Sequence, residues 1–178
     1  QLGLVLKNTF FFVLGGLAFQ YPIGLLLALA LSRTRIWGSR FFRSAILVPM
    51  LVSPIAAGFI VGRMMFNEAI GPINDILRRI GLPPIAWLSK AWTARAVMIF
   101  VDSWQWIPFF TLFLLASIES LPEEPIDAAK VDGANSWQIF RYIIFPQLIP
   151  ISVITVLIRA LMIVRMVAVS YTHLTLPT

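Results

Sequence analysis

Residues 121–150 read LPEEPIDAAKVDGANSWQIFRYIIFPQLIP, a polar stretch set between two strongly apolar segments. Pro122 and Pro125, with two glutamates between them, are typical of a helix start, because proline suits the first turn and acidic side chains complement the positive end of the helix dipole. Gly133 can take the left-handed conformation that ends a helix, and Asn135, three residues before a glutamine, can cap the next one. The segment therefore predicts two short helices around a tight bend.

The composition of the whole chain indicates a membrane protein. Of its 178 residues, 59% are hydrophobic and only 12% are charged, which is unlike a soluble domain. A transmembrane helix needs about 20 predominantly apolar residues. Such runs occupy residues 9–31, 44–62, 96–118 and 143–169. We therefore expect an all-α membrane protein, a polytopic bundle of about four transmembrane helices.

The distribution of basic residues predicts the orientation of these runs. Residues 32–43 carry four arginines and no acid, the pattern of a cytoplasmic turn under the positive-inside rule. Residues 63–95 would then lie outside, and the polar stretch at 119–142 inside. The net charge of +6 could suggest nucleic acid as a partner. Most basic residues, however, lie in turns beside apolar runs, where they anchor the chain at lipid headgroups, so no nucleic-acid partner is expected.

The predicted external stretch contains one amphipathic helix. Its apolar residues recur at the helical period, while Asn74 and the charged residues lie on other faces. We expect this helix to lie along the membrane surface and to end at Gly81. The apolar face consists of Ile73, Ile76, Leu77 and Ile80.

Prolines and glycines mark special positions in the first two runs. Pro49 and Pro54 free backbone carbonyls, which inside a bilayer must be satisfied by neighbouring helices, hydroxyls or water. A kinked helix facing a cavity and a kink packed against its neighbours both fit this pattern. In the first run, Gly15, Gly16 and Gly24 favour close approach of helix backbones.

The third run holds the one acidic residue inside a predicted span. An aspartate near the middle of a span costs about 2.5–3.5 kcal/mol, so it should face a partner, a cavity or the interface. Tryptophans beside it could stack on a sugar ring or belong to the interfacial aromatic belt. Structural pairing of the aspartate and a translocation path both remain open. The candidates for such a path are Asp102, Trp104, Gln105 and Trp106.

The polar stretch resembles the EAA loop of ABC importer permeases, the cytoplasmic coupling segment that docks on an ATPase subunit. The matching residues are two short motifs, DAA and DGA, followed after eight residues by IIFP. Aspartate stands where the family usually has glutamate and phenylalanine where leucine is usual, and both changes keep the chemistry. The resemblance implies ATPase contacts within 127–146, made by Asp127, Ala128, Ala129, Lys130, Asp132, Gly133, Ala134 and Pro146.

Three further stretches extend the resemblance to the sugar-type permeases, nearest to the subunits of maltose and glycerol 3-phosphate importers. They are FRSAILVPM from Phe42, MFNEAIGPINDIL from Met65 and WQWIPFFTLFLLASIESLPEEP from Trp104. The family implies a heterodimer with a second permease, a pair of cytoplasmic ATPase subunits that bind ATP and magnesium, and an external solute-binding protein. It also implies a multi-pass protein of the bacterial or archaeal cytoplasmic membrane.

No phosphate-binding GxxxxGK[ST] loop occurs in this sequence, so ATP hydrolysis is expected in a partner chain, and this chain is expected to need no cofactor. A secondary transporter or channel is the alternative, since it could also have kinked spans and an intramembrane aspartate. It would not need a coupling loop of this type. An embedded enzyme would need several catalytic groups at one depth, and the predicted spans contain no histidine or cysteine. Neither catalytic residues nor a metal site are therefore expected.

The resemblance also suggests domain limits. Residues 1–169 are expected to form a permease domain that lacks about one helix at each end. Residues 170–178 match neither the family pattern nor an apolar period, and they resemble read-through of a synthetic sequence.

Overall fold

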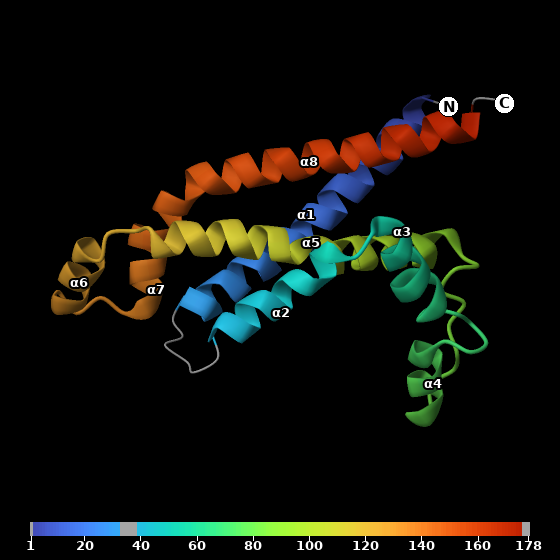
Figure 1. The fold of residues 1–178 in the computed structure, drawn as a ribbon, viewed down its shortest axis with the longest axis horizontal. Helices are drawn as coiled ribbons and strands as arrows, with labels where there is room; N and C mark the ends of the chain where they lie inside the picture. Colours follow the sequence, from blue (N-terminus) through green and yellow to red (C-terminus); the bar gives the residue numbers. More distant parts are fainter. Residues whose placement is uncertain (1, 33–38, 176–178) are drawn as a thin grey trace.

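The computed structural model describes residues 2–32 and 39–175, and within them all regular structure is helical (Figure 1). The predicted all-α class is thus confirmed. The elements are α1 (Leu2–Ser32), α2 (Ser39–Leu51), α3 (Pro54–Ala57), the π-helical η1 (Gly58–Met64), α4 (Pro72–Arg79), α5 (Ala91–Glu119), α6 (Glu124–Val131), α7 (Ser136–Ile139), the π-helical η2 (Phe140–Ile144) and α8 (Phe145–Thr175).

Three described helical stretches are long and apolar enough to cross a membrane, namely Lys7–Ser32, Ala91–Glu119 and Ser136–Met166. They agree with the first, third and fourth predicted spans. Half of the arginine-rich turn, residues 33–38, lies outside the described residues, as do residues 176–178 of the predicted tail. The backbone of α8 continues as a helix to Thr175.

The second predicted span differs from a single kinked helix. It consists of two apolar pieces, Phe41–Leu51 and Pro54–Met64, which meet at an angle of 90°. Proline at position 54 favours a break, because it lacks the backbone N–H that would continue the α-helical ladder and clashes with the preceding turn. The span count is therefore three, or four if the bent pair forms one broken span.

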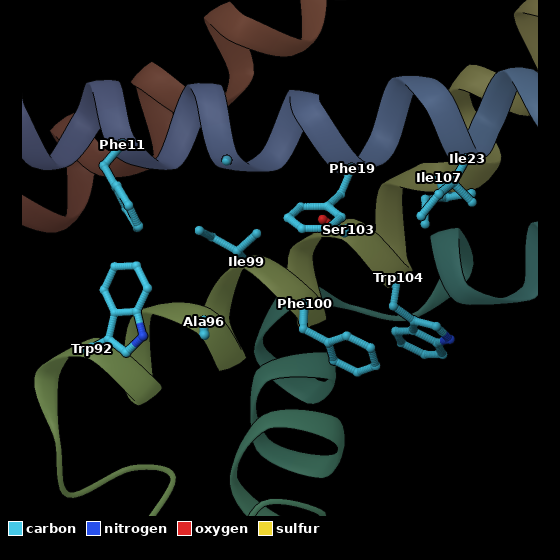
Figure 2. A pocket seen from close by; sticks show the side chains of 11 residues that line it. Phe11, Phe19, Ile23, Trp92, Ala96, Ile99, Phe100, Ser103, Trp104 and Ile107 are labelled. Carbon is cyan, nitrogen blue, oxygen red and sulfur yellow. The ribbon is translucent and has the colours of Figure 1, made fainter.

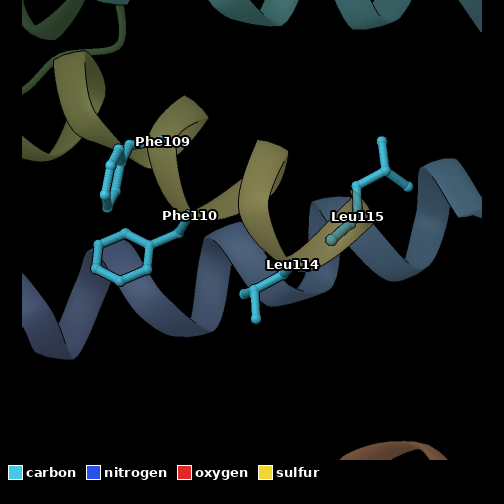
Figure 3. Packing of buried hydrophobic residues seen from close by; sticks show 5 residues of the cluster. Phe109, Phe110, Leu114 and Leu115 are labelled. Atoms are coloured by element: carbon cyan, nitrogen blue, oxygen red, sulfur yellow. The ribbon is translucent and has the colours of Figure 1, made fainter. Parts of the chain in front are cut away.

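The centre of the fold is the crossing of α1 and α5 (Figure 1). Phe110 and Leu114 of α5 are fully buried, together with Ala28 of α1 (Figure 3). Gly24 permits this contact, because a Cβ there would lie 2.5 Å from the Cβ of Phe110. At Gly15 a Cβ would lie 2.8 Å from the Ile99 side chain. Both glycines thus serve the close packing that the sequence predicts.

The region around α4 corrects one expectation. Helix α4 exists where it is predicted, and Gly81 ends it with a φ of +80°. Asn74, however, is fully buried, whereas Ile76 and Ile80 of the predicted apolar face are more than half exposed. The Asn74 amide explains the difference, because it donates to the carbonyls of Glu68 and Ile85 and accepts from two N–H groups. It holds the surrounding loop together.

Helices α4 and α6 lie near opposite ends of α5 (Figure 1). At the α6 end, Arg43 of α2 donates two hydrogen bonds to the carboxylate of Glu119, at the end of α5. The one arginine of the predicted cytoplasmic turn whose side chain is described therefore lies at the same end of the molecule as the predicted coupling loop.

Candidate coupling loop and interspan cavity

The predicted coupling loop is a helix-turn-helix made by α6 and α7. Gly133 ends α6 with a φ of +81°, in the left-handed region that side chains rarely adopt. Asn135 begins α7 with a complete capping box, since its side chain accepts from the Gln138 N–H at 2.9 Å and its own N–H donates to the Gln138 side chain at 2.8 Å. The predicted turn is thus confirmed in both of its details.

The outer face of this loop is exposed. No residue of α6 is buried, and Asp127 and Lys130 form an ion pair of 2.7 Å on its surface. Val131 is 88% exposed at the end of the helix. Asp132, Ala128 and the turn glycine are also exposed, while Ala129 and Ala134 are partly covered. An exposed helix with small and apolar side chains can enter a cleft of another protein.

The sequence also predicts that two aromatic residues, Trp137 and Phe140, pack the second short helix against the spans. Phe140 is partly buried and its ring contacts Phe145 of α8, whereas Trp137 is 68% exposed and its ring contacts Phe140. Ile139 is the buried residue, at 8% exposure. The helical period explains this, because a residue two positions after Trp137 points to the opposite side of the helix. Pro146 lies exposed in the first turn of α8.

Three spans meet at a polar cluster that consists of Gln20, Asp102 and Arg159. The guanidinium of Arg159 donates to both carboxylate oxygens of Asp102 at 2.5 Å and to the Gln20 side-chain oxygen at 3.0 Å. The Gln20 amide donates to Asp102 at 2.8 Å, which closes the triangle. Arg159 is 2% exposed, and its guanidinium lies 4.4 Å from the centre of the Trp106 ring. The cluster therefore joins α1, α5 and α8.

A cavity of about 610 Å³ lies beside this cluster, between α5, α8 and the broken second span. Asp102, Gln105 and Trp106 line it, together with Arg159, so the structure brings together three of the four predicted path residues. Trp104 does not line this cavity. It lines a groove between α1 and α5 (Figure 2). It also packs against the apolar cluster that contains Phe66.

Gln105 has a second contact that bears on the broken span. Its side-chain amide donates to the carbonyl of Val52, at the break between α2 and α3, over 2.6 Å. A neighbouring helix thus satisfies a backbone carbonyl at the proline break, one of the three solutions that the sequence leaves open. Gln105 itself is 5% exposed.

Sequence reasoning missed Gln20 and Arg159 as members of this site. The signal was present, because an arginine in the fourth run and an aspartate in the third run both need a partner inside a membrane. A glutamine in an otherwise apolar first run is a weaker signal of the same kind. What the sequence does not contain is the depth at which the three helices cross, and that decides which polar groups meet.

Comparisons with known proteins agree with this architecture. The family described as binding-protein-dependent transport system inner membrane component matches residues 20–175. The chain belongs to this family. The predicted membership of the importer permease family is therefore confirmed.

Named relatives of this permease chain cover most of its length. The arabinooligosaccharides transport system permease protein AraP of Bacillus subtilis is 34% identical over 93% of this chain and 53% of its own. The trehalose/maltose transport system permease protein MalF of Thermococcus litoralis is 31% identical over 84% of this chain and 50% of its own. The chain spans about half the length of the curated relatives it matches.

A solved structure shares the permease fold. It is the crystal structure of a bacterial ABC transporter involved in the import of the acidic polysaccharide alginate, with a TM-score of 0.78 and 27% identity. The match covers 86% of this chain and 54% of that one. A bacterial alginate ABC transporter in complex with an alginate pentasaccharide-bound periplasmic protein gives a TM-score of 0.77 at 28% identity.

Proposed function

We propose that this chain is a permease subunit of an ATP-driven importer, for sugars or related polyols and sugar phosphates. It would form half of the translocation pathway and couple to an ATPase subunit through residues 127–146. The observation that carries this proposal is the exposed helix-turn-helix of α6 and α7, in a chain of the binding-protein-dependent family. ATP and magnesium would be bound by the ATPase and not by this chain.

We expect the coupling loop to move as a rigid unit when force is applied to α6. The left-handed Gly133 and the Asn135 capping box fix the angle between α6 and α7, and α7 continues through η2 into α8. An ATPase that grips α6 would therefore pull directly on a membrane span. The motion would tilt α5 and α8 and switch the cavity between its inward-facing and outward-facing states.

The cavity suits a sugar-like solute in its chemistry. It combines carboxylate, guanidinium and amide groups with an indole ring. Sugar hydroxyls form hydrogen bonds with the three polar groups, and the sugar ring stacks on the indole. We therefore keep Asp102, Gln105 and Trp106 as path candidates and add Arg159. The names of relatives, including one for arabinooligosaccharides and one for trehalose and maltose, support the same class of solute.

The chain would lie in a bacterial or archaeal cytoplasmic membrane, and three partners follow from the proposal. They are the ATPase subunits at the α6 end, a second permease, which we expect to be a different chain, and an extracytoplasmic solute-binding protein at the α4 end. The alternative of a secondary transporter or channel predicts no ATPase. Affinity purification of the tagged chain from its host membrane distinguishes the two. Recovery of an ATPase in stoichiometric amount supports the proposal, and its absence from an intact, folded preparation contradicts it.

The coupling function is tested by Gly133→Val in the purified complex, reconstituted with its binding protein in proteoliposomes. Valine at a φ of +81° costs about 1–2 kcal/mol and changes the angle of the loop. We expect normal insertion but less solute imported per ATP hydrolysed. Gly81→Val controls for the effect of backbone strain on insertion, because that glycine has a φ of +80° and, like Gly133, nothing within 4 Å of a built Cβ. Import at the wild-type ratio in the Gly133 variant would exclude the coupling role.

A further inference from the structure

An apolar groove of about 540 Å³ runs along the contact between α1 and α5, away from the polar cluster (Figure 2). Eleven residues line it, and Ser103 supplies the one side-chain hydroxyl among them. Its walls are open to the surroundings, since Phe19 and Phe100 are more than half exposed. The proposed coupling and import functions make no use of this groove.

The lining follows from the helical period on both helices. On α1 the groove residues recur every four positions, at Phe11, Gly15, Phe19 and Ile23. At 1.5 Å per residue this stripe is about 18 Å long, close to the roughly 15 Å of hydrocarbon in one leaflet of a bilayer. The groove thus has the length of one lipid tail.

Basic side chains stand at one end of the groove. The rings of Phe11 and Trp92 meet there at 5.8 Å, so the starts of both helices are adjacent. Lys7 is one turn before Phe11 on the same face of α1, and Arg95 is one turn before Ile99 on α5. Helical side chains lean toward the N-terminus of their helix, so both cations lean toward the open end of the groove.

Among the residues that the structure describes, these cations have no carboxylate partner. Lys7, Arg95 and the adjacent Lys90 take part in no ion pair within residues 2–32 and 39–175. Glu68 accepts a hydrogen bond from Ser89, which precedes Lys90 in the chain, but Glu68 forms no ion pair with Lys90. A tail-length apolar groove that ends at unpaired cations is complementary to a molecule with a hydrocarbon chain and a negative head.

We propose that this groove binds an anionic phospholipid, with one acyl chain along the Phe11 to Ile23 stripe and the phosphate at Lys7 and Arg95. Charge complementarity selects this occupant, because a neutral transmembrane helix of another subunit would leave both cations unpaired at the groove mouth. Lys90 adds a third positive charge at the same end. Trp92 covers the mouth, as tryptophans do at the depth of lipid headgroups.

Native mass spectrometry of the full chain, titrated in detergent with phosphatidylglycerol or phosphatidylcholine, tests the proposal. We expect one tightly held phosphatidylglycerol and weaker phosphatidylcholine. In Lys7→Gln/Arg95→Gln, anionic lipid should bind about twenty-five-fold more weakly, at about five-fold per charge removed. Arg165→Gln is the matched control, because Arg165 is an exposed cation on a different helix, α8, and should leave binding unchanged.

A second variant tests the contact with the acyl chain rather than with the phosphate of the lipid. Ala96→Trp fills the groove from an exposed lining position and should weaken both lipids, while circular dichroism verifies that the helices are retained. A photoreactive benzoylphenylalanine in place of Phe100, in phosphatidylglycerol membranes, should give an adduct of lipid mass. An adduct to a second copy or to another subunit would overturn the proposal, as would equal binding of both lipids by the wild-type chain.

Discussion

Arg159 shows how a single buried charge organises this protein. Its guanidinium has three hydrogen bonds to Asp102 and Gln20 and a ring contact with Trp106, and it is almost completely removed from solvent. A charge in that position is tolerated only because every partner is in place. The cluster therefore favours one relative position of the three helices, because its hydrogen bonds form only when these helices pack in one register.

Breaking the cluster should be costly. Asp102→Ala leaves Arg159 buried without its counter-charge, and removal of one partner of a buried ion pair costs about 3–5 kcal/mol. Asp102→Asn keeps a hydrogen-bond acceptor and should cost less. Unfolding of the detergent-solubilised chain, followed by far-ultraviolet circular dichroism, measures both. Asp75→Asn is the control, because its ion pair with Arg79 is exposed and should contribute little. Equal stability of Asp102→Ala and the control would contradict a structural role for the cluster.

At the scale of elements, the broken second span depends on its neighbour. Pieces α2 and α3 meet at a right angle, and the amide of Gln105 on α5 donates to the carbonyl at the break. Inside a bilayer no water is present to hydrogen-bond a free carbonyl. The bend therefore depends on the hydrogen bond that Gln105 donates. The same residue also lines the cavity, which links the bend to the candidate path.

Gln105→Leu should therefore destabilise the bend. The change leaves the Val52 carbonyl unpaired, at a cost of about 1–3 kcal/mol. Gln147→Leu is the matched control, because Gln147 also donates to a backbone carbonyl but is exposed. Hydrogen exchange of residues 50–57 should rise in the first variant alone. Unchanged exchange there would mean that the bend is stable without the glutamine.

The contact between α1 and α5 provides a second test at this scale. Gly24→Ala places a Cβ 2.5 Å from the Cβ of Phe110 and 3.2 Å from the Thr111 nitrogen, so the helices must separate, at a cost of roughly 1–3 kcal/mol. Gly58→Ala should be harmless, because nothing lies within 4 Å of its built Cβ. Thermal unfolding of the two variants measures the difference, and similar melting temperatures would rule out a tight crossing at Gly24.

At the scale of the whole molecule, the two ends proposed to bind partners are separated by the spans. The coupling loop lies at one end, and α4 with its Asn74-centred loop lies near the other (Figure 1). The lipid groove and the polar cluster lie between them, on different sides of α5. Under the proposed function, the chain would receive force from the ATPase at one surface and respond at the other.

The two ends can be assigned to membrane sides by cysteine labelling, because residues 1–178 contain no cysteine. Ser136→Cys in α7 should react with a membrane-impermeant maleimide only from the cytoplasm, and Ser89→Cys near α4 only from outside. Ser103→Cys is the buried control and should not react from either side. Labelling of positions 136 and 89 from the same side would refute the predicted orientation.

The sequence by itself determined the elements of this protein, apart from the right-angled break in the second span. Local rules sufficed for the apolar runs, for the left-handed glycines and for the capping box, because each depends on residues within a few positions of one another. The coupling-loop motif lies within one such stretch, and therefore the family could be predicted before any contact was known. Residue roles within the loop and the path remain predictions.

Only the tertiary structure decided which polar residues meet. The pairing of Asp102 with Arg159 and Gln20, the right-angled break held by Gln105, and the burial of Asn74 all join residues from separate segments. The helical period placed Asn74 off the apolar face. Its amide is nevertheless buried, because four hydrogen bonds offset the free-energy cost of removing it from water. Such contacts depend on where helices cross, and crossing depth is set by packing over the whole chain rather than by any local pattern.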